Sequence, residues 1–189
     1  EFPFNEENKS LLSDRWHKVK FENNIGYVFS MALEIEGEVE EAIKNLIIQK
    51  SKEFNEDKCL MLAIAKRESR FFPYMVSSAN AQGVFQLMED AVLHVNEEFG
   101  KKISDRFDIN QNIEAGILYF QIIKRKYEGK DNFWEKCLAG WNRGMKKVKA
   151  DEVFVIDDQP IETQQFIQDV FKFWEDCKNK LKNSGKILL

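Results

Sequence analysis

The sequence has few residues that interrupt regular structure and few that bind metals. Only 3 Pro and 9 Gly occur among 189 residues, and long alternating apolar runs are lacking, which together favour helix over sheet. The chain has 2 His, 3 Cys and no Cys-x-x-Cys pair, which argues against a zinc site. We therefore predict neither a metal centre nor a cofactor.

Long apolar segments and excess positive charge are lacking too. No stretch approaches the roughly 20 apolar residues of a membrane span. No signal peptide is recognisable at the start, and we expect that a natural one is absent from this sequence. The net charge of −4 argues against nucleic-acid binding, which usually needs a basic face. Apolar residues at 43% and charged residues at 32% are typical of a soluble globular protein.

The three cysteines each lie within an apolar helical pattern. They are Cys59, Cys137 and Cys177. Buried free thiols are the default interpretation, and a single disulfide is the alternative.

Apolar periodicity predicts an all-α fold. The chain divides into an N-terminal helical appendage (1–54), a core domain (55–182) and a tail (183–189). We expect a short helix around 9–19 and a bent helix over 25–50 in the appendage. The core helices are expected from about 57 to 68, 83–98, 110–127, 131–141 and 161–181, with a small β-hairpin as one option near 150–158.

One carboxylate lies where a core-facing helical stripe ends. Leu60, Ile64 and Glu68 share that stripe, and Pro73 follows it. An acid that loses water on folding has a raised pKa and can protonate a leaving group near neutral pH. The alternative is an ordinary carboxylate that turns into solvent at the helix end.

Other polar groups lie in apolar or tightly turned surroundings. They are Ser69, Gln86, Asn142, and Glu162 with Thr163. Each needs a partner or a ligand, and singly each is best explained as a structural hydrogen-bonding group. Together with Glu68 they could line one groove for a carbohydrate, which requires directional hydrogen bonds and apolar faces.

Four sequence motifs carry a specific resemblance. They are Glu68-Ser69 with Ser77 and the run 80–89 (NAQGVFQLME), then 108–120 (DINQNIEAGILYF), 140–144 (GWNRG) and 162–167 (ETQQFI). In order and spacing they resemble the soluble lytic transglycosylase family, which is related to goose-type lysozyme. The resemblance covers roughly residues 58–175 and implies a lysozyme-like helical domain.

The motifs also depart from the family pattern. Asn80 stands for a Gly, which fits a left-handed backbone, and Glu89 stands for a Pro. Phe85 replaces a Met, Trp141 replaces a Tyr, and residues 143–146 (RGMK) replace Ala-Gly-Pro-Gly. These changes keep the acid and the polar groups but alter the walls of the groove.

The resemblance implies cleavage of peptidoglycan without water. Glu68 would protonate the β-1,4 bond between N-acetylmuramic acid and N-acetylglucosamine, then act as base to close a 1,6-anhydro ring. Residues 69–88 contain no acid, which fits a mechanism with one catalytic carboxylate rather than two. The expected substrate-binding residues are Ser69, Ser77, Gln86, Met88, Tyr119, Trp141, Asn142 and Glu162, with Phe85 either a ring face or core.

Two other functions remain open. One is a lysozyme-type hydrolase, for which the nearest second acids are Glu89, Asp90, Asp157 and Asp158, none in a recognisable catalytic context. The other is a non-catalytic peptidoglycan-binding module. By resemblance we expect a location in the bacterial periplasm or envelope, with glycan strands as partner. We also expect a monomer, and the N-terminal helices leave open docking onto an envelope machine.

Overall fold

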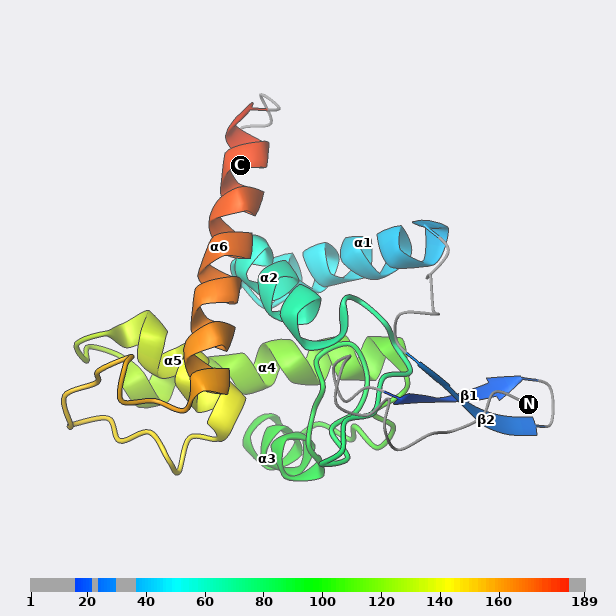
Figure 1. Ribbon diagram of the computed structural model, residues 1–189, viewed down its shortest axis with the longest axis horizontal. Coiled ribbons are helices and arrows are strands. Elements are labelled where there is room, and N and C mark those ends of the chain that lie inside the picture. The colour runs from blue at the N-terminus through cyan, green and yellow to red at the C-terminus, as the bar shows by residue number, and fades with distance from the viewer. Residues whose placement is uncertain (1–15, 22–23, 30–36, 184–189) are drawn as a thin grey trace.

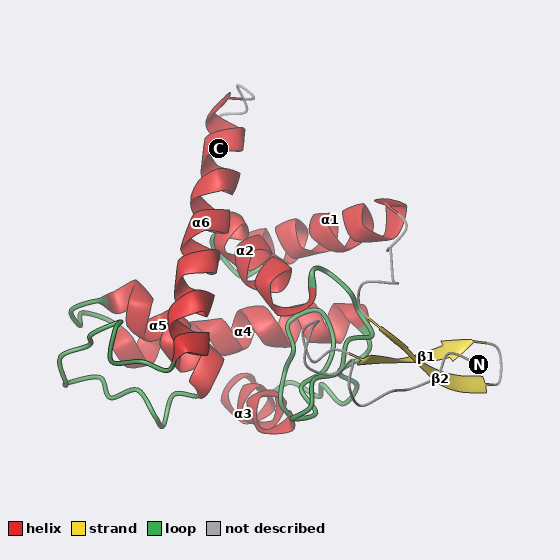
Figure 2. Cartoon of the chain, viewed as in Figure 1, coloured by secondary structure: helices red, strands yellow, loops and turns green. Residues whose placement is uncertain are grey.

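A computed structural model describes residues 16–21, 24–29 and 37–183. Within these ranges a two-stranded hairpin precedes six helices (Figure 1; Figure 2). The elements are β1 (Trp16–Phe21), β2 (Asn24–Phe29), α1 (Gly37–Glu53), α2 (Lys58–Ser69), α3 (Glu89–Phe99), α4 (Ile109–Tyr127), α5 (Phe133–Arg143) and α6 (Ile161–Asn183). The prediction of a helical fold is confirmed for residues 37–183.

The hairpin is not where the sequence placed one. β1 and β2 pair antiparallel, with Trp16 opposite Phe29 and Phe21 opposite Asn24, so the helix expected over 25–50 begins only at Gly37. The helix expected around 9–19 is wrong for 16–19, and residues 9–15 lie outside the described ranges. Both strands are short and rich in aromatic and β-branched residues, which favour strands. Residues 150–158, where a hairpin was an option, form an irregular loop.

Helix α4 lies at the centre of the helical part. It packs against α1, α3 and α5, and Figure 1 shows it between α2 and α3. Its buried side chains Ile113, Ile117 and Phe120 follow the spacing of one helical face. Gly116 lets the Phe85 ring approach the helix axis, because a Cβ there would lie 2.6 Å from Phe85 Cγ.

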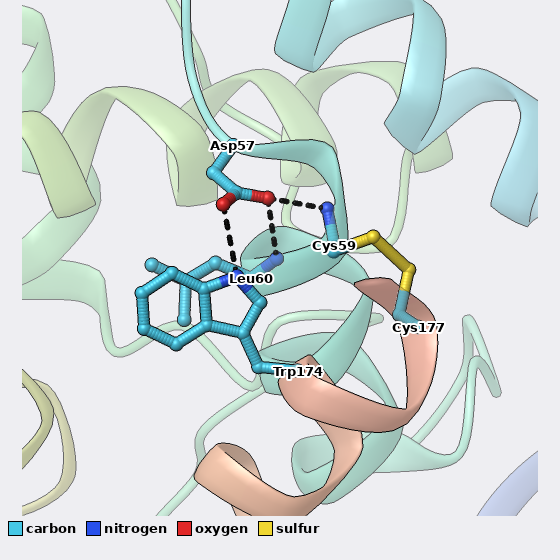
Figure 3. The surroundings of a disulfide bond; sticks show 5 residues. All are labelled: Asp57, Cys59, Leu60, Trp174 and Cys177. Carbon is cyan, nitrogen blue, oxygen red and sulfur yellow. Dashed lines mark hydrogen bonds between the residues drawn. A yellow bond between two sulfur atoms is a disulfide. The ribbon is translucent and has the colours of Figure 1, made fainter. Parts of the chain in front are cut away.

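Helices α2 and α6 pack together and are joined covalently (Figure 3). Cys59 and Cys177 form a disulfide, which corrects the default interpretation of free thiols, whereas Cys137 is a buried free thiol as predicted. Asp57 caps α2, since its Oδ1 accepts from the Cys59 amide at 2.8 Å. The other oxygen of Asp57 accepts from Trp174 Nε1 at 2.9 Å, so one carboxylate links the start of α2 to α6.

A long loop, residues 70–88, separates α2 from α3. The sequence predicted that α3 would begin near Gly83, but it begins at Glu89. Left-handed backbone at Asn80 (φ 64°), Gly83 (φ 80°) and Gln86 (φ 47°) prevents a helix there, and the tolerance expected of Asn80 is confirmed. None of the described helices combines the length and apolar character that a membrane crossing requires.

Candidate active site

A cleft of about 1180 Å³ opens beside the C-terminal end of α2. Parts of its wall come from the 70–88 loop, α3, α4, the end of α5 with the segment after it, and the start of α6. Eight of the nine predicted site residues line it, namely Glu68, Ser77, Gln86, Met88, Tyr119, Trp141, Asn142 and Glu162. The fold therefore brings together residues that are up to 94 positions apart, from Glu68 to Glu162.

Glu68 lies in the last turn of α2 and is partly buried. The helix ends because Arg70 takes a left-handed conformation (φ 55°), which leaves the Glu68 carboxylate at the cleft. Trp141 Nε1 donates a hydrogen bond to Glu68 Oε1 at 2.8 Å. An indole N–H has one proton and no acceptor, so this contact fixes one carboxylate oxygen.

Trp141 lies at the centre of an aromatic wall. Its ring centroid is 5.9 Å from that of Phe85, 5.7 Å from Tyr119 and 6.0 Å from Phe120. Trp141 is only 9% exposed, so its ring is locked by packing while its N–H reaches Glu68. Phe85 is fully buried and belongs to the core, which decides against a role as a ring face for substrate.

Tyr119 presents its side chain to the cleft between two ring neighbours. Besides Trp141, His94 is a ring neighbour, at 6.4 Å between centroids. Burial, and then the Asp90 carboxylate, raise the pKa of Tyr119. Its hydroxyl therefore stays protonated at neutral pH and can donate a hydrogen bond into the cleft.

Gln86 and Ser77 are held by the loop that carries them. Gln86 Nε2 donates to the carbonyl oxygens of Met75 at 3.0 Å and Gly83 at 2.9 Å, which directs the amide nitrogen into the loop. Ser77 Oγ accepts from the Ala81 amide at 3.0 Å, which leaves its hydroxyl proton to be donated elsewhere. Both side chains thus offer a single remaining polar function to a ligand.

Ser69 corrects one prediction of direct substrate contact. Its side chain is fully buried, and its Oγ donates to the Val84 carbonyl at 2.7 Å. A hydroxyl with no exposed surface cannot touch a ligand in the cleft. Ser69 instead ties the end of α2 to the 70–88 loop and so positions Glu68 relative to that loop.

Asn142 and Glu162 face the cleft from α5 and α6. Asn142 Oδ1 accepts from Thr163 Oγ1 at 2.7 Å, so its amide nitrogen is the group left for a ligand. Glu162 is exposed in the first turn of α6, where a carboxylate is favourable to the helix dipole. Met88 is 46% exposed and precedes α3 as its N-cap residue.

The sequence reasoning missed Asn112 on α4, which forms hydrogen bonds to the backbone of the 70–88 loop. Asn112 is 1% exposed, and its Oδ1 accepts from the Phe85 amide at 2.9 Å. Its Nδ2 donates to the Gln82 carbonyl at 2.9 Å and the Arg106 carbonyl at 2.8 Å. The available signal was an amide on the apolar face of α4, because a buried polar side chain needs partners.

The lining also includes charged residues beyond the predicted substrate-binding set. Acids on α3, Asp90 and Glu97, share the cleft with Glu68 and Glu162. Of the acids weighed as a second catalytic group, Asp90 lines the cleft, and Glu89, Asp157 and Asp158 do not. In the ranges that the structure describes, no group of three or more His, Cys, Asp or Glu side chains is arranged to hold a metal ion.

Curated relatives are similar in sequence to part of this chain. It is 34% identical over 88 residues to a membrane-bound lytic murein transglycosylase C of Mannheimia succiniciproducens, an alignment that covers 44% of this chain and 25% of the relative. It is 36% identical over 87 residues to the Photorhabdus laumondii protein of the same name, covering 43% and 24%. This chain therefore spans about a quarter of the length of these curated relatives.

The fold matches solved structures. The lytic transglycosylase Slt of Pseudomonas aeruginosa, solved as an inactive mutant, superposes with a TM-score of 0.65 at 20% identity, covering 74% of this chain and 24% of that one. The family model of the transglycosylase SLT domain matches residues 45–153 of this chain. That match includes Glu68 and the cleft residues through Asn142, and it covers more than half of the 189 residues. The chain belongs to the transglycosylase SLT domain family.

Proposed function

We propose that this chain is the catalytic domain of a peptidoglycan lytic transglycosylase. It would cleave the β-1,4 bond between N-acetylmuramic acid and N-acetylglucosamine without adding water. The observation that carries the proposal is Glu68 at the end of α2, facing a large cleft with one carboxylate oxygen held by Trp141 Nε1 at 2.8 Å. The family membership and the names of the relatives support the same reaction.

Glu68 would serve as acid and then as base. The protonated carboxyl gives its proton to the glycosidic oxygen as the bond to the muramic acid C1 breaks, which releases the next sugar with a free hydroxyl. The substrate's N-acetyl group stabilises the positive C1. The Glu68 carboxylate then takes the proton of the C6 hydroxyl, and O6 bonds to C1. The proton balance closes, and no water is consumed.

The other cleft residues would bind and orient the glycan. Asn142 offers amide protons, Gln86 offers an amide oxygen, and Ser77 and Tyr119 offer hydroxyl protons to sugar hydroxyl or N-acetyl groups. The exposed parts of Met88 and the Trp141 ring supply apolar contact. Glu162 would accept hydrogen bonds from sugar hydroxyls at the start of α6. Such fixed groups raise the rate by holding the scissile bond at Glu68.

The test is digestion of purified peptidoglycan followed by mass spectrometry of the products. The wild type should release fragments with 1,6-anhydro ends, and Glu68→Gln should release none. Glu89→Gln is the matched control, because Glu89 is an exposed glutamate outside the cleft lining, and it should retain activity. Cleavage by Glu68→Gln at the wild-type rate would disprove the proposed role.

Hydrolysis is a second candidate because three further carboxylates line the same cleft, Asp90, Glu97 and Glu162. A hydrolase would use one of them to activate water. Its products would be heavier by one water than anhydro products, so the same spectra separate the two reactions. If reducing ends are found, the substitutions Asp90→Asn, Glu97→Gln and Glu162→Gln identify the second acid.

The disulfide bears on location. Disulfides persist in oxidising compartments and are rare in the cytosol, and Cys59–Cys177 joins two core helices. This supports the proposal of a bacterial envelope location, where peptidoglycan also lies. A monomeric state and a partner bound through the N-terminal residues stay predictions, the latter now for a segment that includes a hairpin as well as α1.

A further inference from the structure

Four basic side chains line one part of the cleft. They come from the end of α4, the end of α5 and the segment after it, and we call them the basic rim: Lys126, Arg143, Lys146 and Lys147. The chain as a whole has a net charge of −4, so this cluster of positive charge contrasts with the negative charge of the whole chain. Like charges gathered at one place repel one another, and an anionic partner offsets that cost.

The backbone of the segment after α5, which carries Lys146 and Lys147, is held by hydrogen bonds. Lys126 Nζ donates to the Met145 carbonyl, and Tyr127 Oη donates to the Val148 carbonyl at 2.9 Å. The Lys147 amide closes a turn on the Gly144 carbonyl at 3.1 Å. The segment is therefore anchored to α4 while the side chains of Lys146 and Lys147 are exposed.

The cations of the rim lack acidic partners in the described part of the chain. No ion pair within 4.0 Å there involves any of the four, although Asp90, Glu97 and Glu162 line the same cleft. Arg143 is tied through Nη1 to Gln159 Oε1 at 2.6 Å, but its buried Nε has no hydrogen-bond partner. By contrast, neighbouring Lys149 outside the cleft is paired with Glu152 at 2.6 Å.

We propose that the basic rim binds carboxylates of the peptide stems that the muramic acid residues of peptidoglycan carry. The inference rests on the proposed function and adds a substrate preference to it. In peptidoglycan the lactyl carboxyl of muramic acid is joined to the peptide stem through an amide bond. The free carboxylates of the substrate are therefore those of the peptide stems. Arg143, Lys146 and Lys147 follow Asn142 in the chain, and all four rim residues line the same cleft as Glu68, so a stem on a sugar bound in that cleft would come within reach of these cations.

The test is a binding measurement that does not depend on turnover. Glu68→Gln protein is titrated calorimetrically with a disaccharide–tetrapeptide and with the same compound after its carboxylates have been amidated. Exposed charge pairs are individually weak, so we expect the free carboxylates to improve the Kd about three- to tenfold. Lys126 and Arg143 are already hydrogen-bonded to Met145 and Gln159, so the preference should depend on Lys146 and Lys147. Adding Lys146→Gln and Lys147→Gln should remove it, and adding Lys149→Gln, the matched control, should keep it.

The outcomes separate this inference from the proposed reaction. Equal affinity for the two compounds, or a preference that survives the loss of both lysines, overturns the role of the rim whether or not the enzyme cleaves peptidoglycan. A preference that depends on the lysines supports the rim even if the digestion shows no anhydro products. Salt provides a further check, because the preference should shrink as ionic strength rises and screens exposed charges.

Discussion

The indole nitrogen of Trp141 donates a hydrogen bond to Glu68 Oε1 at 2.8 Å. The two residues are 73 positions apart, and each is fixed by its own element, Glu68 by the end of α2 and Trp141 by the aromatic wall on α4 and α5. A donor on a carboxylate oxygen favours the ionised form. In the proposed mechanism that form exists between the two proton transfers, so Trp141 would hold Glu68 ready to act as base.

Removing this donor should therefore slow catalysis. Trp141→Phe keeps an aromatic ring but no N–H, and the loss of a hydrogen bond to a charged group predicts a fall in kcat of about ten- to a hundredfold. Trp141→Tyr restores a hydroxyl donor and should retain more activity than Trp141→Phe. Peptidoglycan turnover is measured beside the free energy of unfolding, to separate catalysis from packing. Equal kcat values for Trp141→Phe and the wild type would contradict this role.

Asn112 should be required for the shape of the catalytic loop. Asn112→Ala leaves the buried Phe85 amide and the partly buried Arg106 carbonyl without this partner. The Gln82 carbonyl loses one of its two donors and keeps the Leu87 amide. Unsatisfied buried groups of this kind predict a loss of about 2–4 kcal/mol in the free energy of unfolding, with lower activity because Gln86 lies on the same loop.

The matched control for Asn112 is Asn110→Ala on the same helix. Asn110 is exposed and should change stability by less than about 0.5 kcal/mol. Urea unfolding of both variants measures the difference. A stable Asn112→Ala protein with full activity would show that the 70–88 loop keeps its shape without this amide.

Several elements could be predicted from the sequence because one local signal decided each. Asp57 and the apolar stripe up to Glu68 defined α2, and the polar Gln86 and Asn142 in apolar surroundings pointed to the cleft. The hairpin was missed because runs as short as Trp16–Phe21 fit either period. The disulfide was left open because its cysteines are 118 positions apart, and only the packing of α2 on α6 brings them together.

For the remaining site residues, the direction of the side chain could not be predicted from the sequence. Ser69 was grouped with Glu68 because they are adjacent, but one helical step turns its hydroxyl toward Val84 and the core. Gln86 adopts a left-handed backbone, which no propensity predicts for glutamine. The sequence comparison placed the change at 143–146 in the walls of the groove but assigned no role to its charges, and the path of the segment after α5 brings both Lys146 and Lys147 to the cleft.

The disulfide should contribute substantially to stability. It closes a loop of 118 residues between α2 and α6, and restricting the unfolded chain in this way predicts about 2–5 kcal/mol. Reduction of the wild type should lower its midpoint of chemical unfolding. The double variant Cys59→Ala/Cys177→Ala should match the reduced protein and be insensitive to reductant. If reductant leaves the wild-type midpoint unchanged, the bond contributes little to stability.

Cys137 should be unreactive in the folded protein. Burial raises the pKa of its thiol to about 12, and only the thiolate is nucleophilic. A thiol reagent at about pH 8 should therefore label no cysteine in the native protein, one in denaturant, and all 3 after reduction. Labelling of the native protein before unfolding would contradict either the burial of Cys137 or the disulfide.

Glu114 should make stability depend on acid pH. Burial acts to raise its pKa, but hydrogen bonds from Lys101 and then Lys50 outweigh burial and hold the pKa below its ordinary value. The distances are 2.7 Å and 3.2 Å, and the pair with Lys50 joins α4 to α1. A carboxylate with a lowered pKa stabilises the fold above its unfolded value of 4.5. That stabilisation is lost as the pH falls through the folded value.

Glu114→Gln should therefore lower the free energy of unfolding at neutral pH by about 0.5–1.5 kcal/mol, because the partners are only partly exposed. The difference from the wild type should shrink as the pH falls below 4.5 and through the lower pKa of the folded protein, where the wild-type carboxyl also becomes neutral. Glu53→Gln is the control, since Glu53 also pairs with Lys50 but is 51% exposed at 3.4 Å. Urea unfolding across this pH range measures both variants. A deficit that stays constant with pH would mean that Glu114 stabilises the protein by packing and not by its charge.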